Sequence, residues 1–198
     1  MHSLDALRAA IIADDGLPDW AARATGPVFG EGPPDAALML VGEQPGDEED
    51  RGGRPFIGPA GRLLDGLLNK AGVPRRQTYV TNAVKHFKFT QAGKRRLHQS
   101  PNAGDIAHYR PFLRAEVALV APRLVVALGA TALRALTGKA LTLTRVGDRT
   151  LHTEDGVPLR ATMHPSALLR MRDPAVRMAQ ERRCVAALRS AYAEAAGG

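Results

Sequence analysis

The chain has 198 residues, of which 44% are hydrophobic and 24% are charged, a balance that excludes a disordered chain and suits one globular domain over residues 1–198. The formal net charge is +7 and the sequence pI is about 10.2, so a nucleic acid is an expected partner. The charge is uneven, since residues 1–60 carry most of the acids and residues 85–100 carry none. This asymmetry predicts a basic docking face.

A single cysteine, Cys184, excludes an internal disulfide and a thiolate metal cage. No apolar run approaches the length of a membrane span. The N-terminal residues lack the basic start and the long apolar segment of a secretory signal. We therefore expect a soluble, cytoplasmic and monomeric protein that does not bind membranes.

Apolar periodicity and turn residues divide the chain into alternating helices and strands. Helices are predicted over residues 4–13 (with Ser3 as its cap), 61–72, 105–120, 131–136 and 174–195. Strands are predicted over residues 37–41, 78–82, 124–128 and 159–163, and an extended excursion over 141–155. This alternation predicts the α/β class, as a three-layer α/β/α architecture around a central four-stranded, mostly parallel sheet.

The residues at the carboxyl ends of the predicted strands are the natural place to look for a site, because ligands of open α/β sheets bind there. Those ends carry Glu43 and Gln44, Asn82, Gly129 and His164. Three of the four ends therefore offer groups suited to chemistry.

A basic segment, residues 85–98, leaves the strand that ends at Asn82. It contains no acid and holds five cations, namely Lys85, Lys88, Lys94, Arg95 and Arg96. We expect this loop to meet a polyanion. It closes on His98, whose charged form is disfavoured beside three cations, so the neutral imidazole could act as a nucleophile or a base. The alternative is a solvated basic loop with an incidental histidine.

The turn Gly42–Gly46 lacks the spacing of a dinucleotide-binding loop and the Gly-Lys-Ser/Thr of a P-loop. Glu43 would repel phosphate there, but it could activate water or stabilise a developing cation, and Asp47 could share that task. Phe56, in the rigid loop that follows, could stack on a base. The alternatives are an acidic turn and an ordinary core phenylalanine.

Two further strand ends carry groups suited to recognising a base. The Asn82 amide offers one donor and one acceptor, which matches a base edge with the same pair. After the last strand, His164 is a possible proton donor, Leu168 or Leu169 could wedge into a base stack, and Arg170 could hold a phosphate. The alternatives are turn residues at Asn82 and a helix start capped by Ser166.

Together these segments resemble the uracil-DNA glycosylase superfamily, and most of all its family 4-like UdgX branch. The resemblance rests on five motifs that span nearly the whole chain: Gly42–Gly46, Pro55–Gly58, Thr81–Phe89, Lys94–His98 and His164–Ser166. The Lys-Arg-Arg-Leu-His motif is the most specific of them, although the UdgX branch has isoleucine in place of leucine.

The resemblance implies that the protein flips uracil out of DNA and cleaves its glycosidic bond. It also implies that His98 then attacks the sugar C1′ and forms a covalent adduct, as the loop histidine of UdgX proteins does. Its catalytic residues would be Glu43, Asp47, His98 and His164. Its substrate-binding residues would be Gly42, Gln44, Phe56 and Asn82. Its DNA-binding residues would be Lys94, Arg95, Arg96, Ser166, Leu168 and Arg170. The expected partner is uracil-containing DNA, with single strands preferred.

The iron–sulfur ligands depart from the family pattern. The UdgX branch and its nearest relatives hold a [4Fe–4S] cluster mainly through cysteines, whereas residues 17–23 contain none here and Tyr109 stands where a cysteine is expected. His86 occupies another ligand-like position. One cysteine does not hold such a cluster, so we predict that the protein has no metal and no cofactor.

Three rival functions remain open. The first is a conventional uracil-DNA glycosylase that releases a free abasic site. The second is a non-catalytic DNA-binding module on the same fold. The third, a small-molecule nucleotide enzyme, is disfavoured because the chain has no phosphate-binding loop and carries a long basic segment.

Overall fold

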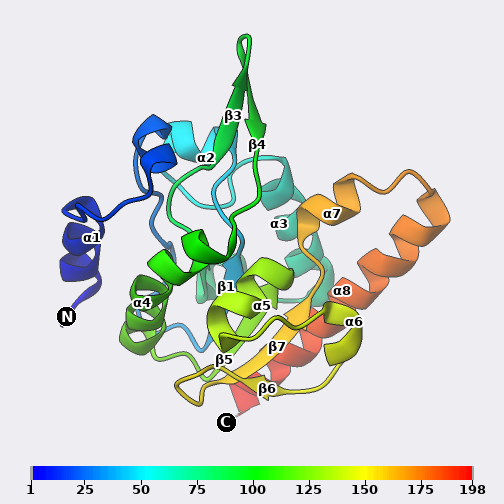
Figure 1. Ribbon diagram of the computed structural model, residues 1–198. Helices are drawn as coiled ribbons and strands as arrows, with labels where there is room; N and C mark the ends of the chain where they lie inside the picture. Colours follow the sequence, from blue (N-terminus) through cyan, green and yellow to red (C-terminus); the bar gives the residue numbers. More distant parts are fainter. Residues whose placement is uncertain (1, 198) are drawn as a thin grey trace.

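The computed structural model describes residues 2–197 and has a five-stranded central sheet (Figure 1). Its strands are β1 (Leu38–Gly42), β2 (Thr78–Asn82), β5 (Leu124–Leu128), β6 (Leu151–His152) and β7 (Pro158–Thr162). Their order is β2-β1-β5-β7-β6, with β6 antiparallel to β7 and the other pairs parallel. The predicted α/β class is confirmed, but the predicted count of four strands is one too few, because a two-residue strand has no detectable periodicity.

Helices cover both faces of the sheet, which confirms the three layers. The helices of one layer are α1 (Leu4–Ile12), α4 (Ala103–Val120), α5 (Ala130–Thr137) and the short α6 (Leu143–Val146). Those of the other layer are α3 (Pro59–Ala71), α7 (Pro165–Leu169) and α8 (Pro174–Gly197). Alternate residues of β1 enter opposite cores, with Met39 and Val41 on the α4 side and Leu38 and Leu40 on the α3 side. Burial on both faces explains why the strand is apolar throughout.

The pairing register makes the carboxyl ends of the parallel strands meet at one edge of the sheet. Gly42 pairs with Asn82 across β1 and β2, and Leu128 pairs with Thr162 across β5 and β7. The segments that leave these ends therefore start close together, at the edge that faces upward in Figure 1.

The predicted basic loop is instead largely a β-hairpin, formed by β3 (Phe89–Ala92) and β4 (Arg95–His98). A two-residue turn joins the strands, and its first residue, Gly93, has a positive φ of 59° that glycine adopts readily. The hairpin rises from the carboxyl edge of the sheet and is the highest feature in Figure 1. Because Phe89 pairs with His98, the histidine lies at the base of the hairpin.

The helix predictions are otherwise close to the structure. Ser3 caps α1 as predicted, since its Oγ accepts the Ala6 N–H at 3.1 Å. The short helices α2 (Asp47–Gly52), α6 and α7 and two 3₁₀ turns, Asp19–Arg23 and Arg75–Gln77, were not predicted. The excursion predicted as extended over residues 141–155 contains the helix α6 and the strand β6. Within residues 2–197, no helix is long and apolar enough to cross a membrane.

Candidate active site

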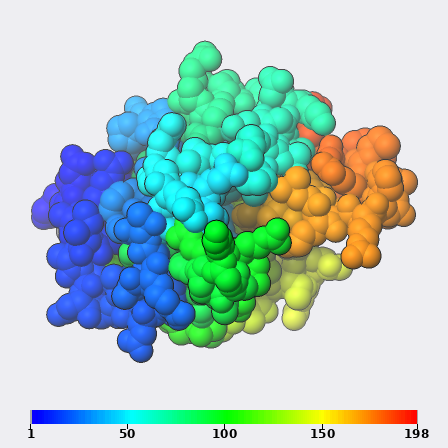
Figure 2. Space-filling view, turned by 90° about the horizontal axis from the view of Figure 1, so that it is seen from above, coloured from blue at the N-terminus to red at the C-terminus, as the bar shows by residue number. Residues whose placement is uncertain are grey.

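The backbone holds the ends of β1 and β2 together beyond the sheet itself. The Ala83 N–H donates to the Gly42 carbonyl at 2.9 Å, and the Val84 N–H donates to the Glu43 carbonyl at 3.0 Å. Seen from above, the surface is hollowed between the hairpin, the segment around residues 45–60 and the α7 region (Figure 2). Because of these two backbone hydrogen bonds, Glu43 and Asn82 lie at the ends of two neighbouring strands that are held together.

Three side chains converge above Gly42. A Cβ atom at this position would fall 2.4 Å from Asn82 Oδ1, 2.6 Å from Phe56 Cζ and 3.4 Å from His164 Nε2. Only glycine leaves this space open. Phe56 adopts a positive φ of 56°. A Cβ atom at Gly61 would lie 1.8 Å from the Phe56 carbonyl oxygen, so the backbone of α3 packs directly against the backbone of Phe56. This arrangement presents an aromatic ring, an amide and an imidazole to one small space.

The Asn82 amide is free to recognise a ligand. Asn82 is only 2% exposed, and its side chain forms no hydrogen bond within residues 2–197. A bound molecule that supplies one acceptor and one donor would match the amide.

His164 has a defined tautomer. The Ser166 N–H donates to its Nδ1 at 3.2 Å, so Nδ1 is an acceptor and the proton of the neutral ring lies on Nε2. Burial lowers the pKa of His164 to about 4. At neutral pH the ring is therefore uncharged and presents an Nε2–H donor above Gly42.

Glu43 lies between two partners. Thr131 Oγ1, in the first turn of α5, donates to its Oε2 at 2.6 Å, while Oε1 lies 3.3 Å from His98 Nε2. Burial tends to raise the pKa of Glu43, but the hydrogen bonds from His98 and Thr131 outweigh it and leave the pKa below its usual value. The carboxylate is thus ionised and fixed in orientation. Sequence reasoning missed Thr131, although it follows the end of β5 by only three residues.

His98 faces the site from the hairpin. Its side chain is 48% exposed, and its ring lies 6.2 Å from the ring of Phe87, centroid to centroid. The site therefore has a carboxylate and an imidazole on one side and the His164 donor on the other. Such an arrangement suits a reaction in which positive charge develops beside Glu43 and negative charge beside His164.

Gln44 does not present its amide to this space as predicted. Its Nε2 donates to the carbonyls of Lys88 and Gln99 at 3.1 Å each, and its Oε1 accepts the Lys88 N–H at 3.2 Å. The amide is fully used in joining the two ends of the hairpin. Gln44 is therefore a brace that places the root of the hairpin, and with it His98, next to Glu43.

Arg96 also serves the hairpin, which corrects its predicted role in DNA binding. Its guanidinium forms ion pairs with Asp47 and with Asp50, the latter at 2.6 Å, and it lies over the rings of Phe87 and Phe89. Its side chain is only 11% exposed, so it offers little to a phosphate. Asp47 thereby ties α2 to β4, and its catalytic role stays a prediction.

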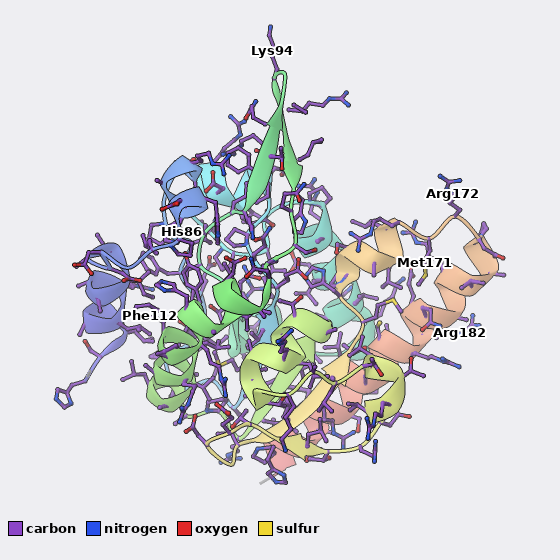
Figure 3. All side chains as sticks on the ribbon, in the orientation of Figure 1. His86, Lys94, Phe112, Met171, Arg172 and Arg182 are labelled. Atoms are coloured by element: carbon purple, nitrogen blue, oxygen red, sulfur yellow. The ribbon has the colours of Figure 1, made fainter. Side chains whose placement is uncertain are left out.

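Two more cations of the basic segment are neutralised inside the protein. Lys85 is buried against Glu116, with Nζ 2.6 Å from Oε2, and Lys88 binds Asp105 at 2.6 Å. Only Lys94 and Arg95, at the tip of the hairpin, remain exposed; Figure 3 shows Lys94 pointing away from the body. The predicted basic face is thus much smaller than the sequence count suggests.

The two leucines that were considered as wedges are consecutive residues of helix α7, but only one of them is exposed. Leu168 is fully buried in the core with α3 and α8, which corrects its predicted contact with DNA. Leu169, the next residue, is 41% exposed, and Arg170 is also exposed. Arg172 and Met171 lie in the turn before α8, where Arg172 points outward (Figure 3). The N-cap of this helix is His164 and not Ser166: its Nδ1 accepts the Ser166 N–H and lies 2.8 Å from the Ser166 hydroxyl.

The residues at the expected cluster positions do come together, but they do not fit a [4Fe–4S] cluster. Trp20 and His86 both pack against Tyr109, with ring centroids 6.4 and 5.8 Å away, and His86 Nδ1 is hydrogen-bonded to the Tyr109 hydroxyl at 2.7 Å. Such clusters take thiolate ligands. The only thiol of the chain, Cys184, lies on α8 in the other helical layer, beside Thr162.

A separate surface depression of about 770 Å³ lies along α4 and residues 154–155. The charges along its wall are already paired, Arg110 with Glu154 and Arg114 with Asp155. The strand ends, where unpartnered groups converge, are therefore the stronger candidate.

Comparison with known proteins agrees with this fold. The model of the Uracil DNA glycosylase superfamily matches residues 29–189. The chain is 38% identical over 154 residues to the type-4 uracil-DNA glycosylase of Thermotoga maritima, with 77% of each chain covered. It is 36% identical over 159 residues to that of Pyrobaculum aerophilum, with 76% of each chain covered. It is 30% identical over 177 residues to that of Sulfurisphaera tokodaii, with 85% of this chain and 77% of the relative covered.

The chain therefore belongs to the uracil-DNA glycosylase superfamily. The resemblance noted from its sequence motifs is confirmed at this level.

Replacing Arg96 tests its role as an anchor. In Arg96→Ala the carboxylate of Asp50, which is fully buried, loses its cation, although Thr25 still donates to it. We expect the free energy of unfolding to fall by roughly 2–4 kcal/mol. Denaturant unfolding measures this, with the exposed Arg95→Ala as a control that changes it by less than about 0.5 kcal/mol. Equal losses in the two variants would contradict the anchor.

The low pKa of His164 predicts a pH dependence of stability. Between its ordinary pKa of 6.5 and the folded value of about 4, the unfolded chain binds a proton that the folded protein does not. The free energy of unfolding therefore falls as the pH drops through this window. His164→Asn should lack this part of the slope, as measured by melting temperatures across the window. Parallel curves for the two proteins would show that His164 is not buried in its neutral form.

Proposed function

We propose that the protein is a uracil-DNA glycosylase, and that the space above Gly42 receives a uracil flipped out of DNA. The observation that carries the proposal is the convergence of Phe56, Asn82 and His164 on this space, facing Glu43 and His98. The activity of the type-4 relatives supports it.

Uracil matches the groups that the site offers. Its N3–H and O4 present a donor beside an acceptor, which the Asn82 amide complements. The ring of Phe56 offers a surface for stacking, and both contacts would offset the few kcal/mol that base flipping costs. The Nε2–H of His164 would then donate to an oxygen of the base.

The same groups would stabilise the transition state. Cleavage of the C1′–N1 bond leaves positive charge on the sugar and sends an electron pair to the uracil ring. Glu43, ionised at neutral pH, would stabilise the cation. The neutral His164 would stabilise the uracil anion by its hydrogen bond.

We further propose that His98 captures the sugar cation, as in the UdgX branch. As Nε2 of His98 forms the bond to C1′, its proton would pass to Glu43, which lies 3.3 Å away. Glu43 would then release this proton through water to the uracil anion and return to its ionised form, so one proton moves from His98 to uracil in all. The brace at Gln44 and the anchor at Arg96 support this role, because they hold the root of the hairpin beside Glu43.

A denaturing gel tests the capture. Wild-type protein incubated with an oligonucleotide that contains one deoxyuridine should give a heat- and SDS-stable shifted band. His98→Ala should lose this band because it has no nucleophile. His152→Ala, which changes an exposed histidine on β6, should keep it. Alkali-sensitive abasic sites without any shifted band from the wild type would favour the conventional glycosylase instead.

The DNA would approach over the hairpin tip and α7. Lys94, Arg95 and Arg170 are the exposed cations from the predicted contacts, and Leu169 replaces Leu168 as the candidate wedge. Binding through so few phosphate contacts should depend only modestly on salt. The preference for single strands and the monomeric state stay predictions.

We also propose that the enzyme works without an iron–sulfur cluster. Two sets of contacts at the expected cluster positions support this proposal. Trp20 and His86 pack on Tyr109, and Trp20 Nε1 donates a hydrogen bond to Asp105 at 2.7 Å. These residues therefore form a small packed core of their own.

Iron analysis checks the absence of the cluster. Protein produced with ample iron and sulfide, and purified without oxygen, should contain no stoichiometric iron. Its melting temperature and activity should be unchanged by a strong iron chelator. Stoichiometric iron, with activity lost on chelation, would contradict the proposal.

A further inference from the structure

Lys85 is the only lysine of residues 2–197 that is completely buried, at 0% exposed. It follows β2 by three residues, and its side chain turns back toward the end of that strand. Its ammonium group donates three hydrogen bonds: to Glu116 Oε2 at 2.6 Å, to Thr81 Oγ1 at 2.7 Å and to the backbone carbonyl of Asn82 at 2.7 Å. All three N–H groups are therefore used, and one of them holds the peptide of the proposed base reader.

Glu116 completes a closed network on the other side. It accepts hydrogen bonds from the hydroxyls of Tyr79, at 2.9 Å, and Thr81, at 3.0 Å, as well as from Lys85. A Cβ at Gly30 would lie 2.4 Å from the Tyr79 hydroxyl and 2.5 Å from Glu116 Oε1, so even a methyl group has no room there. The network is sealed from water and rigid.

The network also acts on the catalytic strand. The residues between Asn82 and Lys85 pair with the end of β1, through the bonds from Ala83 to Gly42 and from Val84 to Glu43. The turn from Asn82 to Lys85 therefore fixes the end of β1, which carries Glu43, and the end of β2, which carries Asn82. Without a cation beneath it, the Asn82 carbonyl would be buried without a partner.

A buried ion pair contributes little net stability, because the cost of removing two charges from water offsets most of their attraction. An apolar pair of similar volume would serve the core as well. An apolar pair would lose the bonds to the Tyr79 and Thr81 hydroxyls and the bond to the Asn82 carbonyl, and of these only the last involves a residue of the proposed site.

We infer that Lys85 is a positioning residue for uracil recognition, which acts through the peptide of Asn82 with Glu116 as its counter-ion. The inference rests on the proposed function, since it takes Asn82 as the reader of uracil. A displacement of the amide by about 1 Å would weaken its contacts to the base in the transition state, at a cost of roughly 10- to 100-fold in rate.

A double-mutant cycle tests the inference. Lys85→Met keeps the length of the side chain but removes its charge. In the wild-type background it should lower the single-turnover rate of uracil release by roughly 10- to 100-fold. In the Asn82→Ala background, where no amide is left to position, it should lower the rate by less than about threefold. A purely structural role would give the same factor in both backgrounds.

Two further variants keep the test decisive. Thr78→Val changes a buried hydroxyl at the other end of β2, bonded to the Arg75 carbonyl, and should leave the rate unchanged. If Lys85→Met does not fold, Tyr79→Phe removes one bond to Glu116 without leaving a charge unpaired. It should give a smaller loss of rate, about two- to fivefold, that also disappears in the Asn82→Ala background.

The outcomes separate the inference from the proposed function. No uracil release by the wild type would overturn the proposed function, and the inference with it. An active wild type with equal Lys85→Met factors in the two backgrounds would overturn the inference alone. A loss of rate on Lys85→Met that occurs only when Asn82 is intact supports the inference.

Discussion

The parallel pairing of β1 with β2, continued past the ends of both strands, is the constraint on which the site depends. Gly42 pairs with Asn82 as the last step of the ladder, and the next two N–H groups of the β2 chain then bond to the carbonyls of Gly42 and Glu43. The backbone thereby places a carboxylate and an amide at neighbouring strand ends. His164 reaches the same point because β7 ends level with β5, which is the neighbour of β1.

Most of the cations of the basic segment are paired with carboxylates inside the protein. Arg96 joins the hairpin to α2, Lys88 joins it to α4, and Lys85 supports the end of β2. Each of these cations meets a carboxylate from a distant part of the sequence. A net charge of +7 is therefore a poor measure of the surface that a nucleic acid meets. These contacts fix the base of the hairpin, where His98 lies beside Glu43.

The fold and the centre of the site could be predicted because their signals are local. The apolar run of β1 indicates a strand covered on both faces, and strand ends in such sheets indicate where Glu43, Asn82 and His164 meet. The partners of Arg96 and Gln44 could not be predicted, since Asp47 and Asp50 lie more than 40 residues away and a basic motif has the same sequence whether it is paired or free. Leu168 and Leu169 are indistinguishable in sequence, and only the packing of α7 decides which is buried.

The number of uracil molecules released per protein chain is the most direct test that the protein excises uracil and that His98 then captures the sugar. It reports on both steps at once. The DNA, with one deoxyuridine per strand, is supplied in large excess, and free uracil is counted by mass spectrometry. We expect a burst that stops near one uracil per protein chain. Continuous release would contradict the capture by His98, and no release at all would contradict the site.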